Sequence, residues 1–385
     1  MSNHYKQAIY LWPSEEQLLL LKAGMLDGDE AVTAFQSWSK HIDLDEYFNY
    51  ETFRLLPLVY ANQLRLGVTH PLMGKLKGIY RKVWSENQQR FYKMRPTLAL
   101  LKDGGVDLLM LKGVPMALSY YRNLALRPMS DFDVAVRPEQ LSLALSLLKK
   151  EGWPFHRTPN DDDLRYFHSL SCVNVEQMEL DLHYHILIEK PCADSDLFFW
   201  SSAQRLDYQG LETLQLSPTA QLMHTILHGI RWNVETPVRW IPDALMIIRE
   251  RGNEIDWEQL ITFAETQHIL FRLNLGLNYL MQHFGLVLPN TVITRLQNYH
   301  PDLRERVLSW SILTNLSTSE RKYYTRIKIF FLLFIRYCCI TNAKNPYQFI
   351  VNYSHYLRCV LQLSSRRDIF LRLLQAFRRM LRNPK

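Results

Sequence analysis

Two aspartates separated by a single residue, Asp131 and Asp133, are the first feature of this 385-residue chain that could carry chemistry. They open the segment 131–136, in which polar and apolar residues alternate as in a half-buried strand. Side chains two positions apart on a strand project from the same face, about 6–7 Å apart. Two carboxylates that close repel each other unless a cation lies between them, and Mg²⁺ prefers oxygen ligands. The pair predicts a metal site, with two solvated aspartates beside a turn as the alternative.

A second strand with ionisable residues on one face is expected from Met178 to Ile186. Its even positions are apolar or aromatic, and its odd positions are Glu179, Asp181, His183 and His185. A half-exposed edge strand without a function shows the same alternation, although acids and imidazoles are unusual there. Placed beside 131–136, this strand would add a third carboxylate to the metal site.

The third feature is the turn Leu111-Lys112-Gly113, which follows a short apolar run, 106–111, typical of a buried strand. The next segment, 115–121, has a helical pattern. A helix N-terminus offers free N–H groups, glycine lets a phosphate approach the backbone, and Lys112 adds a positive charge. The turn predicts a phosphate site, although the same dipeptide is common in ordinary turns.

The order of these three segments resembles the uncharacterised nucleotidyltransferase family of the DNA polymerase beta-like nucleotidyltransferase superfamily. The resemblance is carried by the L-K-G turn at 111–113, the R-x-x-x-D-F-D segment at 127–133 and the E-L-D-L-H-Y segment at 179–184. It extends over roughly residues 15–290, because the segments Leu222–His228 and Arg239–Asp243 are also similar to the family's helices.

The resemblance implies a metal-dependent enzyme that moves a nucleoside monophosphate from a nucleoside triphosphate to an acceptor hydroxyl. Mg²⁺ or Mn²⁺ is the implied cofactor, and ATP is the expected triphosphate. The acceptor, a small molecule, a protein or RNA, cannot be read from the sequence. The alternatives are a non-catalytic nucleotide-binding scaffold and a toxin-like nucleotidyltransferase that modifies RNA.

The resemblance also implies roles for individual residues. The catalytic, metal-binding carboxylates would be Asp131, Asp133 and Asp181, with Glu179 as the alternative to Asp181. The nucleotide would be bound by Lys112, Gly113, Arg127 and His183. Members of the superfamily usually have Gly or Ser after the glycine of the turn, whereas Val114 follows here. The missing hydroxyl leaves Lys112 or Arg127 to supply the contact with the phosphates.

Two further pairs have the i, i+4 spacing of a helix face. His224 and His228 could bind zinc but lack a clear third ligand, so a packed or nucleotide-facing pair is expected. Arg239 and Asp243 could form an ordinary ion pair, or one that supports the site. For the aspartate pair, mutual repulsion predicts that neutralising either carboxylate leaves the fold intact or slightly more stable.

The elements that must position these residues form a small core between helical flanks. Helices are expected over 31–40, 52–66, 71–93 and 139–150, strands over 106–111, 131–136, 170–175 and 178–186, and helices again after Ser217-Pro218. Ser14 and Gln17 have the spacing of a capping box, and Ser217-Pro218 suits a helix start. The expected fold class is α+β, with a small mixed β-sheet. The expected domains are an N-terminal helical region (1–98), a nucleotidyltransferase α/β core (99–215), a helical domain (216–320) and a basic helical C-terminal region (321–385).

Composition places the chain among globular proteins. Hydrophobic residues make up 47% and charged residues 22%, which excludes a disordered or low-complexity protein. The five cysteines have no metal-ligand spacing and an odd count, which favours a reduced compartment. The first ten residues lack an apolar signal core, and the longest apolar run, 329–335, is far shorter than the about 20 residues of a membrane span. We therefore expect a cytoplasmic protein.

Basic residues concentrate at the C-terminal end. The net charge of the chain is +7, and residues 301–385 alone hold 16 Lys and Arg against 4 Asp and Glu. Within them, 366–382 combines apolar residues at helical spacing with many arginines. This helix could pack on 327–340, lie on an anionic membrane, bind an RNA backbone, or only aid solubility. The sequence predicts an anionic partner, RNA or a membrane surface, at this end.

Overall fold

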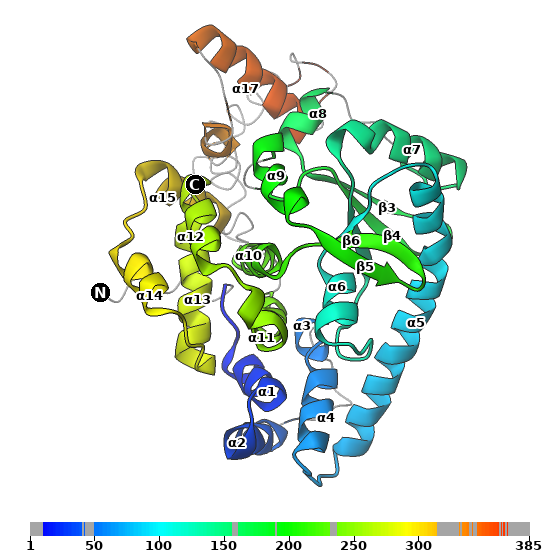
Figure 1. Ribbon diagram of the computed structural model, residues 1–385, viewed down its shortest axis with the longest axis vertical. Helices are drawn as coiled ribbons and strands as arrows, with labels where there is room; N and C mark the ends of the chain where they lie inside the picture. Colours follow the sequence, from blue (N-terminus) through cyan, green and yellow to red (C-terminus); the bar gives the residue numbers. More distant parts are fainter. Residues whose placement is uncertain are drawn as a thin grey trace, which may run out of the picture.

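The computed structural model describes residues 11–40, 42, 50–155, 161–188, 191–231 and 237–313, and then 331, 333–338, 341, 345–361, 363, 365 and 368. Within these residues the fold is α+β, as predicted: one mixed sheet is surrounded by helices from both halves of the chain (Figure 1). The predicted helix 366–382 lies outside the described residues except for Asp368.

Six strands of the described chain form the sheet, in the order β3-β4-β2-β1-β6-β5. They are β1 (Leu109–Met110), β2 (Asp131–Ala135), β3 (Ser169–Val173), β4 (Glu179–His183), β5 (Gln204–Tyr208) and β6 (Leu211–Gln215). β2 is parallel to β4 and β1 is parallel to β6, whereas the other neighbours are antiparallel. The predicted strand 131–136 and the predicted hairpin within 170–186 are confirmed. The run 106–111 is a strand only at 109–110, and the hairpin β5–β6 was not predicted.

The N-terminal part of the chain is helical, as predicted. Its helices are α1 (Glu15–Met25), α2 (Gly28–Ser39), α3 (Tyr50–Phe53), α4 (Leu56–Arg65) and α5 (Met73–Asp103). The capping box is confirmed: Ser14 Oγ accepts from Gln17 N at 3.2 Å, and Gln17 Oε1 accepts from Ser14 N at 3.0 Å. The single helix expected over 52–66 is two helices, because Pro57 fits a first turn and disfavours a helix running into it.

Helix α5 continues beyond residue 93, where the sequence analysis ends it, and passes through Pro96. A proline inside a helix costs about 3 kcal/mol. On both sides of it, however, apolar residues recur at helical spacing and are fully buried at Phe91, Met94, Leu98 and Leu101. Their packing outweighs the local cost. The helix also crosses residue 98, the predicted end of the first domain. The division into four domains stays a prediction.

The remaining helices follow the strands or form the C-terminal half. Those between strands are α6 (Gly113–Pro115), the π-helical turn η2 (Met116–Tyr120), the 3₁₀ turn η3 (Pro138–Gln140), α7 (Leu141–Lys150), α8 (Asp161–Tyr166) and α9 (Ala193–Ser201). Those after the sheet are α10 (Pro218–Gly229), α11 (Trp240–Arg251), the 3₁₀ turn η4 (Gly252–Glu254), α12 (Trp257–Thr266), α13 (Leu270–Phe284), α14 (Asn290–Asn298), α15 (Leu303–Leu313) and α17 (Pro346–Val360). The predicted helix start is confirmed, because Ser217 Oγ accepts from Ala220 N. Of the helices in the described residues, none is long and apolar enough to cross a membrane.

The two faces of the sheet contribute to two different cores. On one face, Phe132, Val134, Leu180 and Leu182 pack with α5 and α7. On the other face, the sheet residues Leu109, Leu111 and Ala135 share a core with the N-terminal helices and with α10–α13. Alternation along β2 and β4 therefore turns their polar residues toward the helices of this second core.

A glycine sets how closely α10 and α11 approach each other beside this face. A Cβ added at Gly229 would lie 2.1 Å from Cγ of Trp240. Gly229→Ala is therefore expected to lower the free energy of unfolding by about 1–3 kcal/mol. The matched control is Gly78→Ala in α5, where nothing lies within 4 Å of the added Cβ; it should raise that free energy by up to about 1 kcal/mol. Urea unfolding compares them, and equal stability of both variants would contradict this packing.

Candidate active site

The register between β2 and β4 brings the predicted site residues together. Asp131 lies opposite Glu179, Asp133 opposite Asp181, and Ala135 opposite His183. Because partners in a sheet project from the same face, the carboxylates of the two strands share one surface. Ligand atoms of Asp133, Asp181 and His183 all lie within 4.8 Å of one another.

His185 does not join this group. The strand ends at His183, and the ring of His185 lies instead between Asp196 Oδ2, at 2.6 Å from Nδ1, and the carbonyl oxygen of Leu164, at 2.9 Å from Nε2. The alternation that placed it on the site face therefore stops two residues earlier than the sequence analysis expects.

Lys112 pairs directly with the carboxylate cluster. Its Nζ lies 2.5 Å from Asp133 Oδ1, and His183 Nε2 donates to the same oxygen at 3.1 Å. Both contacts are shielded from solvent, since the side chains of Asp133 and His183 are only 4% and 2% exposed. Burial alone would raise the pKa of Asp133, but the Lys112 charge and the His183 hydrogen bond outweigh it and hold this pKa well below its usual range. Asp133 is therefore fully ionised at neutral pH.

The backbone at Lys112 is held in an uncommon conformation. Its φ of 50° lies in the left-handed region, which costs roughly 1 kcal/mol for a residue with a side chain. The turn carries this cost while aiming the ammonium at Asp133. Gly113 follows at the start of α6, and a Cβ there would lie 2.5 Å from Sδ of Met129.

The pKa values of two neighbouring acids, Asp131 and Glu179, are shifted in the opposite direction from that of Asp133. Burial, followed by the charge of Asp133, raises the pKa of Asp131. Burial, followed by the charges of Asp131 and Asp181, also raises the pKa of Glu179. Asp131 accepts from Ser130 Oγ at 3.3 Å, and Asp181 accepts from Ser171 Oγ. Ionising all these groups together is unfavourable unless a further cation is present.

The donor set fits a divalent metal ion. Carboxylates suit Mg²⁺ and Mn²⁺, and the oxygens of Asp133 and Asp181 are close enough to share one ion. The cluster holds His183 rather than Asp131 as its third member. Since His183 donates to Asp133, it orients a ligand in the way outer partners of metal sites do. Asp131 lies beside this cluster on the wall of the same cavity.

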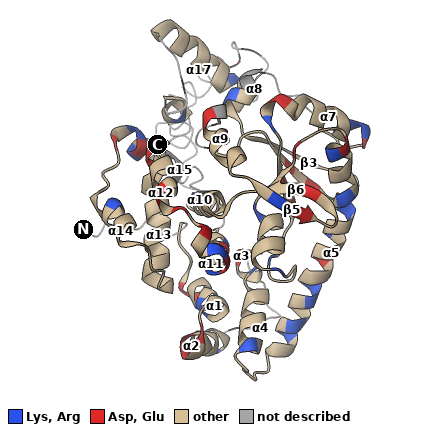
Figure 2. Cartoon of the chain, viewed as in Figure 1, with Lys and Arg blue, Asp and Glu red and all other residues tan. Residues whose placement is uncertain are grey.

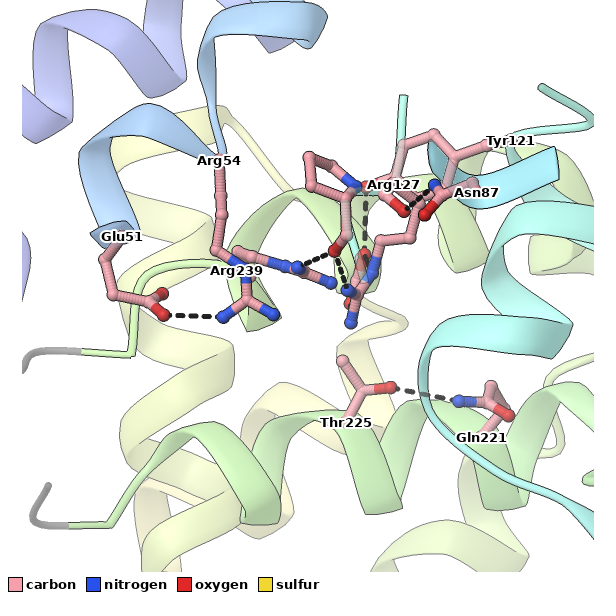
Figure 3. Close-up of polar contacts among 10 residues, drawn as sticks. Glu51, Arg54, Asn87, Tyr121, Arg127, Gln221, Thr225 and Arg239 are labelled. Carbon is pink, nitrogen blue, oxygen red and sulfur yellow. Dashed lines mark hydrogen bonds and ion pairs between the residues drawn. The ribbon is translucent and has the colours of Figure 1, made fainter. Parts of the chain in front are cut away.

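A cavity of about 280 Å³ lies over these carboxylates. Its sheet side is formed by Asp131, Asp133 and Asp181. Its opposite side is formed by residues from α3 and its end, α10, α11 and the adjoining loops, among them Arg54, His224, His228, Arg231 and Arg239. Carboxylates on the sheet side thus face a helical side on which arginines outnumber the carboxylates of Glu51 and Asp243. Figure 3 shows Arg54, Arg127 and Arg239 reaching from three different parts of the chain toward the same space.

Arg127 is tied to the helical wall. Its Nε lies 2.9 Å from both carboxylate oxygens of Asp243, and its Nη2 lies 2.8 Å from Oδ2. Tyr121 Oη also donates to Asp243, at 3.0 Å. The expected pair of Arg239 with Asp243 is therefore not what forms: Asp243 binds Arg127, and Arg239 donates to the carbonyl oxygen of Pro128. Together these contacts fix the loop that leads into β2.

Two guanidinium nitrogens in this wall have no partner within the described residues. They are Nε of Arg54 and Nη2 of Arg239, and both are buried. The other contacts of Arg54 include an ion pair of 2.7 Å with Glu51. A buried donor without an acceptor costs about 1–3 kcal/mol, or more when it is charged. An anionic ligand in the cavity would remove that cost.

His224 and His228 both line the cavity, with ring centroids 5.9 Å apart. Burial, followed by the charge of Lys112, lowers the pKa of His224 to about 3. Burial, followed by Arg231, lowers that of His228 well below its usual value, and Arg231 Nη2 donates to His228 Nε2 at 2.9 Å. Both imidazoles are neutral at pH 7. They belong to no metal-type cluster of the described residues, and they are packed against the cavity.

The sequence analysis missed Arg54 and Arg231 as lining residues, and it contained Trp240 only as part of the segment 239–243. Arg54 belongs to no motif, and nothing in its sequence neighbourhood marks it. Arg231 follows His228 by three positions, and Trp240 precedes the expected pair partner Asp243 by three, so only a resemblance over those helices could have pointed to them.

A family model described as "Uncharacterised nucleotidyltransferase" matches residues 50–285, more than half of the chain. The match begins at α3, ends just after α13, and contains every residue named above as lining the cavity. Comparisons with curated proteins and with solved structures give no match.

The two aspartates of β2 should respond in opposite directions to neutralisation in the metal-free protein. Asp133→Asn leaves the Lys112 ammonium without its carboxylate, which should lower the free energy of unfolding by about 1–3 kcal/mol. Asp131 has a raised pKa, so its ionisation at neutral pH opposes folding, and Asp131→Asn should raise that free energy by less than about 1 kcal/mol. Urea unfolding at pH 7 with a chelator measures both.

The expectation that either change is neutral or stabilising is therefore kept as a prediction for Asp131 and replaced by its opposite for Asp133, because Lys112 compensates that carboxylate. The control is the double variant Lys112→Met/Asp133→Asn, which removes both charges and should recover part of the loss. An Asp133→Asn variant more stable than the parent protein would contradict the ion pair.

Proposed function

The chain belongs to the uncharacterised nucleotidyltransferase family, and from that premise we propose that it transfers a nucleoside monophosphate from a nucleoside triphosphate to an acceptor hydroxyl. One observation carries the proposal. Carboxyl groups of β2 and β4 face buried guanidinium N–H groups of Arg54 and Arg239 that have no partner in the described residues, across a single cavity. A triphosphate bound to a divalent cation has both charges that such a cavity requires.

Asp133 and Asp181 would hold the metal ion, with Asp131 as the third catalytic carboxylate and Glu179 further along the same face. When bound, Mg²⁺ or Mn²⁺ supplies neutralisation of phosphate charge and alignment of the reacting oxygens. His183 keeps the Asp133 carboxylate in place through its Nε2–H. The residues would thus act mainly by positioning and charge compensation.

The phosphates would be bound by the opposite wall. Arg54 and Arg239 offer free N–H groups, and Gly113 lies at the cavity next to Lys112. Lys112 is within reach of both the carboxylates and an incoming phosphate, so its ammonium can exchange one anionic partner for another. Arg127, already bound to Asp243 through three contacts, would hold the loop before β2 and serve the phosphates as a fixed positive charge.

A second candidate function is a nucleotide-binding scaffold without catalysis. It is favoured by the contact between Lys112 and Asp133, because an internal ammonium compensates one carboxylate without any metal ion. In the first proposal, ATP is the expected triphosphate, and the acceptor hydroxyl belongs to a small molecule, a protein or RNA. An anionic partner of the basic C-terminal region, RNA or a membrane surface, also stays a prediction.

Transfer itself is tested by incubating the protein with triphosphates labelled at the α-phosphate, Mg²⁺ or Mn²⁺, and total cell extract. Label should appear in an acceptor, and Asp133→Asn and Asp181→Asn should each reduce its amount at least about 100-fold. The control Asp107→Asn changes a half-exposed aspartate paired with Arg137 outside the cavity and should leave labelling unchanged. Normal labelling by Asp133→Asn would contradict the catalytic role, and triphosphate binding without labelling by the parent protein would favour the scaffold.

The arginine wall is tested separately by titration calorimetry with a non-hydrolysable triphosphate. Arg54→Ala and Arg239→Ala should each weaken binding by roughly tenfold or more, because a hydrogen bond to a charged group contributes about 1.5–3 kcal/mol. Arg137→Ala, a half-exposed arginine outside the cavity, is the matched control and should bind as the parent does. Unchanged affinity in both cavity variants would mean that the phosphates do not bind to these arginines.

A further inference from the structure

A second cavity, of about 470 Å³, lies between α5 and the loop before β2 and shares no lining residue with the first. One side is formed by Tyr80, Arg81, Trp84 and Gln88 of α5, and the other by residues 122–124 of the loop before β2. Two arginines, Arg81 and Arg122, line it, and no carboxylate does. Its chemistry is therefore that of an aromatic, positively charged groove.

The groove belongs to a longer basic face of α5. The helix holds eight Lys and Arg against two acids, and Figure 2 shows basic positions along its length. Residues spaced three and four apart form one face: Lys77, Arg81, Trp84, Gln88, Tyr92 and Arg95. This face is about 27 Å long at 1.5 Å per residue. Glu86 lies on another side of the helix, between Lys82 and Arg90.

Two aromatic side chains on this face are open to solvent, whereas the other large apolar residues of α5 are buried or half-buried. Trp84 is 49% exposed and Tyr92 is 77% exposed. Exposed aromatic rings interspersed with arginines bind single-stranded nucleic acid, because any base can stack on a ring while the cations pair with phosphates. A protein partner would need acidic residues to match this face, whereas every nucleotide supplies both a phosphate and a base.

The opposite wall of the groove is fixed in place. Asn123 Nδ2 donates to Tyr80 Oη at 2.7 Å, and Asn87 Nδ2 donates to the carbonyl oxygens of Leu124 and Arg127, at 2.6 and 2.9 Å. Arg122 adopts a φ of 49°, which is uncommon for a residue with a side chain, and its side chain is 70% exposed. Its Nη2 lies 3.9 Å from Oε2 of Glu250, so a phosphate at Arg122 would compete with this carboxylate. The loop holds the Arg122 cation beside Trp84.

We propose that this groove binds single-stranded nucleic acid, with Trp84 stacking on a base and Arg81 and Arg122 pairing with phosphates. The proposal concerns binding alone and does not depend on nucleotidyl transfer. The same loop continues from residues 122–124 of the groove to Asp131 at the start of β2. Use of a bound strand as the acceptor would rest on the proposed function.

The test measures fluorescence anisotropy of labelled 12-nucleotide single strands, one RNA and one DNA, without metal ion or triphosphate. The parent protein should bind, with affinity falling steeply between 50 and 200 mM salt, as about 3 or more phosphate contacts require. Trp84→Ala should weaken binding about tenfold, which matches the loss of one stacked base. The double variant Arg81→Ala/Arg122→Ala should weaken it at least tenfold and flatten its salt dependence.

The matched control is Lys82→Ala, which removes a neighbouring exposed lysine from another side of α5 and should change affinity less than twofold. Circular dichroism verifies that each variant is folded. Tighter binding of RNA or of DNA identifies the natural strand, and either order supports the groove. Absence of binding to both strands, or equal losses in the Lys82→Ala control and the groove variants, would overturn the proposal. Since no triphosphate is present, neither result depends on whether transfer occurs.

Discussion

The parallel pairing of β2 with β4 is the constraint on which the rest of the site depends. Its register places Asp133 beside Asp181 and Ala135 beside His183, so acidic side chains from two separate segments meet on one face. Shifting either strand by one residue would turn its carboxylates into the apolar core formed with α5 and α7. The buried residues on that side are Phe132, Val134, Leu180 and Leu182. Their packing fixes the register of the two strands and therefore the positions of the carboxylates on the other face.

Acidic side chains concentrated on a buried face need positive charge or hydrogen-bond donors nearby, and the structure supplies them from two sides. Lys112 and His183 satisfy Asp133 within the sheet layer, at the cost of a left-handed backbone at Lys112. Across the cavity, arginines from the helical half supply positive charge, and some of their N–H groups are left without partners. The sheet and the helices thus each contribute a charged wall. This division explains why the family match includes helices on both sides of the sheet in sequence.

Much of the fold and part of the site could be predicted from the sequence, where local pattern and structure agree. Alternation along 131–136 and 178–186 indicated both site strands, and Ser14 and Ser217 indicated helix starts. The rest depends on contacts between distant segments. The helix expected to end at residue 93 continues through Pro96, because apolar residues on both sides of the proline are buried. His185 lies beyond the strand and contacts Asp196, and Asp243 pairs with Arg127 rather than with Arg239 on its own helix. Arg54 enters the site only because the N-terminal helices share a core with α10–α13.

The central claim is that Asp133 and Asp181 bind a metal ion in place of the Lys112 ammonium. Anomalous diffraction from crystals grown with Mn²⁺ and a non-hydrolysable triphosphate tests it most directly. The account predicts a manganese peak between the carboxylates of Asp133 and Asp181, with Lys112 Nζ moved away from Asp133 toward the phosphates. Lys112 still paired with Asp133, and no manganese between the two strands, would contradict it.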